Sequence, residues 1–149
     1  MKGRTGIFLL LLPFVLFSCS CKKTSSLGAS PVLYKSVDTY VDYSGPTYAA
    51  LANPGGYVYY NNAGNKGLII LQDFSGSFWA FDRTCPYHVT SPCATIYMAN
   101  SGLNMVCGSP DRCCASTYGF DGTVTHGPST YPLKAYQVTQ SGTILHITN

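Results

Sequence analysis

Glutamate is absent from this 149-residue chain, so aspartate supplies all six of its carboxylate side chains. A hydrolase that uses two carboxylates as acid and base therefore has few residues available. Tryptophan occurs once, whereas tyrosine occurs 12 times, glycine 15 times and proline nine times. Tyrosine is common in strands, and glycine and proline are common in tight turns, so the composition favours short strands over helices.

A large excess of charge is also missing. Nine lysines and arginines stand against six aspartates, and two of the nine, Lys2 and Arg4, lie among the first four residues. Without these two, seven basic side chains face six acidic ones. A nearly neutral domain lacks the basic surface with which proteins bind phosphate backbones, so we expect no nucleic-acid partner.

The longest hydrophobic run is too short to cross a membrane. Residues 7–17 are apolar, with Pro13 as the one break, and as a helix they would extend only about 17 Å. The hydrocarbon core of a bilayer is about 30 Å thick. A short apolar run behind a basic start is instead typical of a secretion signal. Leu16, Ser18 and Cys19 match the pattern of a lipoprotein cleavage site.

These features divide the chain into three parts. We expect residues 1–18 to be a lipoprotein signal peptide, residues 19–30 a polar tether, and residues 31–149 the folded domain. Acyl chains on Cys19 would anchor the protein in a lipid bilayer of the cell envelope. Ser20 is not acidic, which favours the outer membrane. The alternative is an ordinary secretion signal that happens to contain a cysteine.

Short apolar runs separated by turn-forming residues indicate an all-β sandwich or small barrel of eight to ten strands. Strands are expected over residues 57–60, 68–71, 78–81, 96–98, 103–106, 133–139 and 143–147. One or two edge strands are expected within residues 32–43. Residues 46–51 are compatible with a single helical turn or an extended segment.

Five cysteines of the expected domain fall in two turn-rich loops: loop one, residues 84–93, and loop two, residues 107–118. In an exported protein such cysteines form disulfides, bind metal, or do both. Five is an odd number, so pairing within the domain leaves one thiol over. Cys85 and His88 have the two-residue gap of a metal-binding knuckle, whose side chains can converge on one ion.

Four segments together carry a resemblance to a known family: FDRTCP at 81–86, CCASTY at 113–118, DGTVTHGP at 121–128 and YPL at 131–133. They resemble the Rieske iron–sulfur domain, and are most similar to the Rieske-like lipoproteins of Bacteroidetes-type bacteria. The resemblance runs from about Pro54 to the end of the chain. It implies a Rieske-like β fold in which two cysteine-bearing hairpin loops hold a [2Fe–2S] cluster.

The two loops depart from the family pattern. A Rieske domain has Cys-x-His in loop one and Cys-x-x-His in loop two. Here Cys85 and His88 are one residue too far apart, and Cys114 stands where the second histidine belongs. The second ligand cysteine of the family falls on Asp111 without a gap, or on Cys107 with one.

The resemblance also implies a disulfide and two residues that support the centre. Many Rieske domains link their two loops by a disulfide, whose positions correspond to Cys93 and Cys113. Ser116 corresponds to a serine that donates to a bridging sulfide. Tyr118 lies near the position of a tyrosine that donates to a cysteine sulfur.

The remaining candidate ligands leave two alternatives open. Cys85, His88, Cys107 and Cys114 could bind a [2Fe–2S] cluster or zinc. Alternatively, the cluster has been lost, and Cys85 pairs with Cys114 or Cys107 so that two disulfides hold the loops.

Two functions follow from these alternatives. The favoured function is that of an envelope-anchored, Rieske-type [2Fe–2S] protein, an electron carrier with a redox partner protein. Without a cluster, the protein is a non-redox binding or structural lipoprotein on the same scaffold. An enzyme with a thiol nucleophile is disfavoured, because only His88 beside Cys85 could serve as its base. We therefore expect an electron carrier or binding domain rather than a catalyst.

Three further residue assignments come from local context. Asp82 and Arg83, adjacent at a strand end, are expected to form an ion pair. His126 is expected on a surface loop, and His146 either outward-facing or hydrogen-bonded within the final strand.

Overall fold

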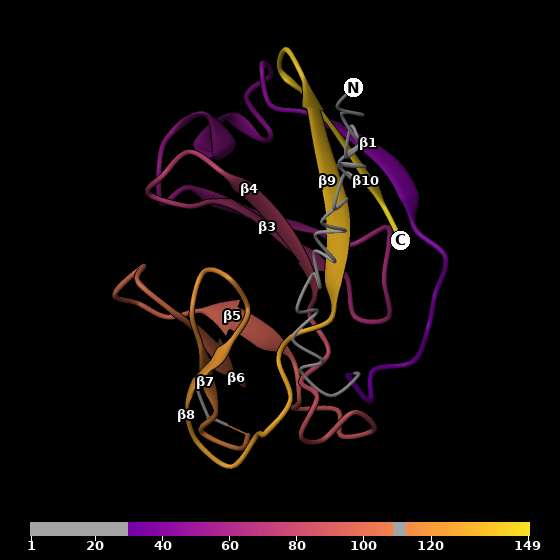
Figure 1. Cartoon of the computed structure of the whole chain (residues 1–149), viewed down its shortest axis with the longest axis vertical. Coiled ribbons are helices and arrows are strands. Elements are labelled where there is room, and N and C mark those ends of the chain that lie inside the picture. The colour runs from indigo at the N-terminus through magenta and orange to yellow at the C-terminus, as the bar shows by residue number, and fades with distance from the viewer. Residues whose placement is uncertain (1–29, 109–112) are drawn as a thin grey trace, which may run out of the picture.

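The computed structural model describes residues 30–108 and 113–149 of the chain (Figure 1). The expected signal peptide, Cys19 and all of the expected tether except Ser30 lie outside these residues. Within the described residues, no helix has both the length and the apolar character needed to span a membrane.

The described residues form an all-β fold, which confirms the fold class expected from the sequence. Ten strands and one turn of 3-10 helix follow one another along them: β1 (Asp38–Asp42), η1 (Ala49–Ala52), β2 (Tyr57–Tyr60), β3 (Leu68–Gln72), β4 (Phe78–Asp82), β5 (Ile96–Met98), β6 (Met105–Cys107), β7 (Thr117–Tyr118), β8 (Val124–His126), β9 (Ala135–Ser141) and β10 (Ile144–Thr148). They make a six-stranded sheet in the order β1-β10-β9-β4-β3-β2 and a four-stranded sheet in the order β5-β6-β7-β8. The smaller sheet lies to one side of the larger one (Figure 1).

Strand β3 is buried on both faces, which explains its unbroken apolar sequence Leu-Ile-Ile-Leu. Successive side chains of a strand point to opposite faces. Ile69 and Leu71 accordingly join a core shared with the four-stranded sheet. Leu68 and Ile70 join a second core, which includes Leu51 of the helical turn. The main sheet therefore separates two hydrophobic cores, and the first of these supports the cysteine loops.

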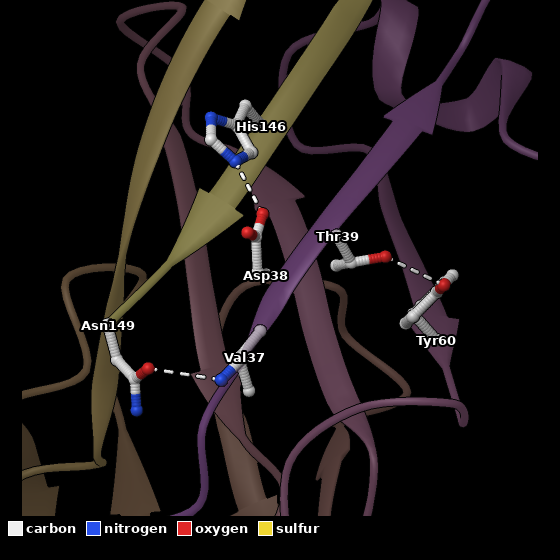
Figure 2. Close-up of polar contacts among 6 residues, drawn as sticks. All are labelled: Val37, Asp38, Thr39, Tyr60, His146 and Asn149. Carbon is white, nitrogen blue, oxygen red and sulfur yellow. Dashed lines mark hydrogen bonds and ion pairs between the residues drawn. The ribbon is translucent and has the colours of Figure 1, made fainter.

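Strand β1 forms one edge of the main sheet and pairs with the last strand, β10 (Figure 2). The His146 Nε2 atom lies 2.8 Å from the Asp38 carboxylate, and the Asn149 side chain accepts a hydrogen bond from the backbone N–H of Val37 at 3.0 Å. Thr39 and Tyr60 share a hydrogen bond of 2.8 Å. These contacts bind the start of β1 both to β10 and to β2.

The expected ion pair between Asp82 and Arg83 is wrong. Asp82 is the last residue of β4 and Arg83 directly follows it, so their side chains point away from each other, as successive side chains of a strand do. Asp82 accepts hydrogen bonds from Asn65, Thr84 and Tyr136. The Arg83 guanidinium instead lies 4.1 Å from the ring centre of Tyr59 and 4.9 Å from that of Tyr97, and its Nε donates to a backbone carbonyl.

Candidate metal centre

Three cysteines reach the same point from separate backbone segments. Cys85 follows β4, Cys107 ends β6, and Cys114 lies three residues before β7. The backbone N–H of Cys85 donates to the carbonyl of Ala94 at 3.0 Å, and that of Cys107 donates to the carbonyl of Ser116 at 3.0 Å. These hydrogen bonds fix the base of each cysteine loop on the sheets.

The three thiols converge into one group, which we call the thiol cluster (Cys85, Cys107 and Cys114). Their sulfur atoms all lie within 4.8 Å of one another. Cys85 and Cys107 are fully buried, and Cys114 is half-buried. The Cys85 and Cys114 sulfurs lie 3.5 Å apart. Three of the four ligands expected from the sequence thus meet in space.

The fourth expected ligand, His88, is not part of this group in the structure. Its side chain is exposed and packs edge-on against Tyr87, with ring centres 4.3 Å apart. His88 is nevertheless carried by loop one, three residues after Cys85. It remains the expected source of a fourth ligand rather than a ligand already in position.

Two hydroxyl groups lie beside the sulfurs. The Tyr118 hydroxyl is 3.6 Å from the Cys85 sulfur, and the Ser116 hydroxyl is 3.2 Å from the Cys114 sulfur. The Ser116 oxygen accepts a hydrogen bond from the Cys114 thiol and another from the backbone N–H of Ser129 at 3.1 Å. Hydroxyl groups that hydrogen-bond to ligand sulfurs tune a bound metal.

The pKa values of the cluster follow from its hydrogen bonds and its burial. The Cys107 thiol hydrogen-bonds to Cys85 and, despite opposing burial, helps lower the pKa of Cys85 to about 5, with smaller contributions from Tyr118 and the backbone of Tyr87. The same hydrogen bond and burial raise the pKa of Cys107. Burial raises the pKa of Tyr118. The cluster therefore favours one thiolate, at Cys85, beside a neutral thiol at Cys107.

The other two cysteines of the domain form a disulfide. Cys93 of loop one and Cys113 of loop two are bonded, with their Cα atoms 5.6 Å apart. The Ser91 hydroxyl lies 3.1 Å from the Cys93 sulfur. Because Cys113 directly precedes Cys114, this bond also restricts where Cys114 can lie relative to loop one.

Two contacts that support the loops cannot be read from local sequence. The Lys66 ammonium, from the turn between β2 and β3, donates to the carbonyls of Ser91 and Ala94 and so ties that turn to loop one. Gly127 lies against loop two with a φ of +102°, and a Cβ atom there would come within 2.5 Å of the Ser116 Cα. Both contacts join segments that are distant in sequence, so local patterns could not reveal them.

The donor chemistry of the thiol cluster fits a single soft metal ion. Around a tetrahedral ion with metal–sulfur bonds of about 2.3 Å, neighbouring sulfurs are roughly 3.8 Å apart. Mutual distances within 4.8 Å are compatible with this arrangement. A [2Fe–2S] cluster needs two ligands on each of two irons, and the described residues bring three ligands together rather than four. As they lie, these residues fit one ion and do not complete a two-iron cluster.

Comparisons with known proteins add a structural likeness. No protein-family model matches the chain, and no curated protein matches it. Among solved structures, the chain is similar to the ferredoxin of carbazole 1,9a-dioxygenase from Nocardioides aromaticivorans. The two are 18% identical, with a TM-score of 0.46, and the match covers 76% of this chain and 97% of the ferredoxin.

Proposed function

We propose that this protein is an envelope-anchored, Rieske-type metal protein whose thiol cluster binds one soft metal ion. The observation that carries the proposal is the convergence of three thiols, two of them fully buried, within 4.8 Å. Thiolates select soft or borderline ions, and zinc is the ion that commonly takes three such ligands with a histidine. His88 on loop one is the proposed fourth ligand.

Such an ion would add to the stability of a small domain by joining its two loops. Free Cys85 and Cys107 are buried in the core beneath those loops. A metal that binds only the folded state stabilises that state by an amount that grows with the logarithm of the ratio of its concentration to its Kd. The proposed role is therefore a structural or binding module presented at the membrane by the lipid on Cys19.

A second candidate is the [2Fe–2S] electron carrier that the Rieske resemblance implies. The observation that favours it is the place of Ser116 and Tyr118, whose hydroxyls lie beside two of the candidate ligand sulfurs. Such a cluster would exchange single electrons with a redox partner protein. This candidate requires His88 to turn inward and the thiols to separate into two ligand pairs.

The test is metal content. The full chain would be produced with zinc, iron and sulfide supplied, purified without oxygen in detergent, and examined by elemental analysis and visible absorption. About one zinc per chain and no colour would support the first candidate. Two irons with a red-brown spectrum would instead support the electron carrier. A protein that binds neither zinc nor iron would exclude both candidate functions and leave the disulfide-linked, non-redox lipoprotein.

Two variants make the metal test specific. Cys107→Ser removes a buried ligand and should abolish stoichiometric binding. His88→Ala should weaken zinc binding without abolishing it, since water can take a fourth position. His126→Ala is the matched control, because His126 is also exposed but lies at the end of β8, outside the two cysteine loops.

The anchor is tested separately. Cys19→Ala should move the protein from the membrane fraction to the soluble fraction of the cell envelope. Mass spectrometry of the wild-type N-terminal peptide should find acyl chains on Cys19. An unmodified Cys19 would favour the ordinary secretion signal.

A further inference from the structure

We propose that Cys85 and Cys114 are a redox-active dithiol, and that its oxidation to a disulfide expels the metal from the thiol cluster. The part about the metal rests on the proposed function. The part about the dithiol stands on the structure alone.

The first observation is the close approach of these two sulfurs. Cys85 and Cys114 lie 3.5 Å apart, and both are free. A disulfide bond is about 2.05 Å long, so the two sulfurs need to approach by only about 1.5 Å. They come from opposite loops, which the neighbouring Cys93–Cys113 bond already holds together. The first disulfide already restricts the two loops to neighbouring positions, so forming the second bond costs little additional conformational entropy.

The second observation is the difference in access among the three thiols. Cys114 is half-buried, whereas Cys85 and Cys107 are fully buried. An external disulfide can therefore reach Cys114 but neither of the other two thiols. Cys107 is additionally held in strand β6, whose register with β5 fixes its backbone. Oxidation should begin at Cys114 and finish at Cys85, with Cys107 left reduced.

The reaction is thiol–disulfide exchange with a low-molecular-weight disulfide. The Cys114 thiolate attacks one sulfur of that disulfide, forming a mixed disulfide and releasing one thiolate. The Cys85 thiolate then attacks the Cys114 sulfur and releases the second thiolate. The two protons lost by the cysteines end on the two released thiols. Overall, the protein loses two electrons and two protons, and the small disulfide gains them.

The consequence for the metal follows from ligand chemistry. A cysteine must be a thiolate to serve as a strong ligand, so the disulfide removes two of the three sulfur donors. Cys107 and the proposed ligand His88 would be the two donors left, and they would hold the ion too weakly to keep it bound. Conversely, Cys85 and Cys114 would be protected from oxidation while their sulfur lone pairs were bound to a metal ion.

The experiment uses the metal-free full chain in detergent, treated with glutathione disulfide without oxygen. Peptide mapping by mass spectrometry identifies each bond and separates these cysteines from Cys19 and Cys21. We expect one new disulfide, between Cys85 and Cys114, that dithiothreitol reverses. Mapping to Cys107, or no new bond within the protein, would overturn the proposal.

Two variants distinguish the order of events. Cys85→Ser should stop the reaction at a stable glutathione adduct on Cys114. Cys107→Ser keeps a hydroxyl beside Cys85 and should still form the Cys85–Cys114 bond, because position 107 contributes no sulfur to that bond. An adduct mainly on Cys85 or Cys107 in the wild-type chain would contradict the proposed order.

The link to metal is read with a zinc indicator. Zinc-loaded protein should release its ion as the disulfide forms, and should oxidise at least tenfold more slowly than the metal-free protein. If the protein binds no zinc but still forms the Cys85–Cys114 bond, the proposed function fails and the dithiol stands. If zinc stays bound after that bond has formed, the switch is refuted even though the metal site is real.

Discussion

The Tyr136 hydroxyl on β9 donates a hydrogen bond of 3.0 Å to the carboxylate of Asp82 at the end of β4. The Asp82 side chain is fully buried, and within the described residues it forms no ion pair. Its charge is compensated by hydrogen-bond donors alone, including the backbone N–H groups of Asn65 at 2.7 Å and Thr84 at 2.9 Å. Burial raises its pKa, but these donors together hold the pKa below its ordinary value.

Removing this carboxylate should destabilise the domain strongly. Asp82→Ala leaves buried donors without an acceptor, and we expect the free energy of unfolding to fall by about 3 kcal/mol. Tyr136→Phe removes one donor and should cost about 1 kcal/mol. Urea unfolding monitored by circular dichroism measures both. Asp121→Asn is the control, because Asp121 is an exposed turn residue, and an equal loss there would contradict this role for Asp82.

The stability of the turn between β3 and β4 should depend on pH through Asp73. Hydrogen bonds from Ser75 and from the Trp79 indole lower the pKa of Asp73 to about 2. Because the folded pKa lies below the unfolded value, the ionised carboxylate stabilises the fold above about pH 4. This stabilisation should be lost as the pH falls towards 2.

Asp73→Asn isolates this contribution. The variant should be less stable than the wild type at neutral pH, and the difference should shrink in acid. Trp79 is the only tryptophan in the chain, so its emission reports directly on the hydrogen bond to Asp73. A pH-independent difference between the two proteins would exclude the proposed titration.

The Cys93–Cys113 bond closes a loop with a sequence separation of 20. Cys93→Ser and Cys113→Ser should each lower the free energy of unfolding by about 3 kcal/mol. The double variant should lose little more than either single variant, since both remove the same bond. Thermal denaturation of the three variants measures this, and additive losses would be inconsistent with a single shared bond.

Gly127 should tolerate no side chain. Gly127→Ala places a Cβ within 2.5 Å of the Ser116 Cα at a left-handed φ of +102°. We expect a loss of about 3 kcal/mol from strain and overpacking together. Gly142→Ala is the matched control, because Gly142 also has a positive φ but nothing within 4 Å of an added Cβ. It should lose only about 1 kcal/mol.

The strands were predictable where local patterns are strong. Strands β2, β3 and β4 were expected from short runs of aromatic and branched residues separated by turns, and they pair as antiparallel neighbours. Strand β7 was missed, because it has only two residues, Thr117 and Tyr118, inside a segment rich in turn formers. Its backbone pairing with β6 and β8 is a tertiary feature that no two-residue pattern can encode.

The candidate site was predictable only in part. The sequence indicated which cysteines lie in the two loops, but the approach of Cys114 to Cys85 depends on the packing of the smaller sheet. The position of the His88 side chain depends on the conformation of loop one, and the sequence of that loop does not predict this conformation. Asp82 and Arg83 form no ion pair although they are adjacent in sequence, because successive side chains at the end of a strand point in opposite directions.

The pairing of β1 with β10 has a mechanical consequence. Its five residue pairs run from Asp38 opposite Thr148 to Asp42 opposite Ile144. If the protein is held at the membrane through Cys19, any pull on the domain enters the sheet at Asp38. A force along β1 loads these pairs together in shear instead of opening them one at a time. The edge strand would then be the element through which tension passes from lipid to protein.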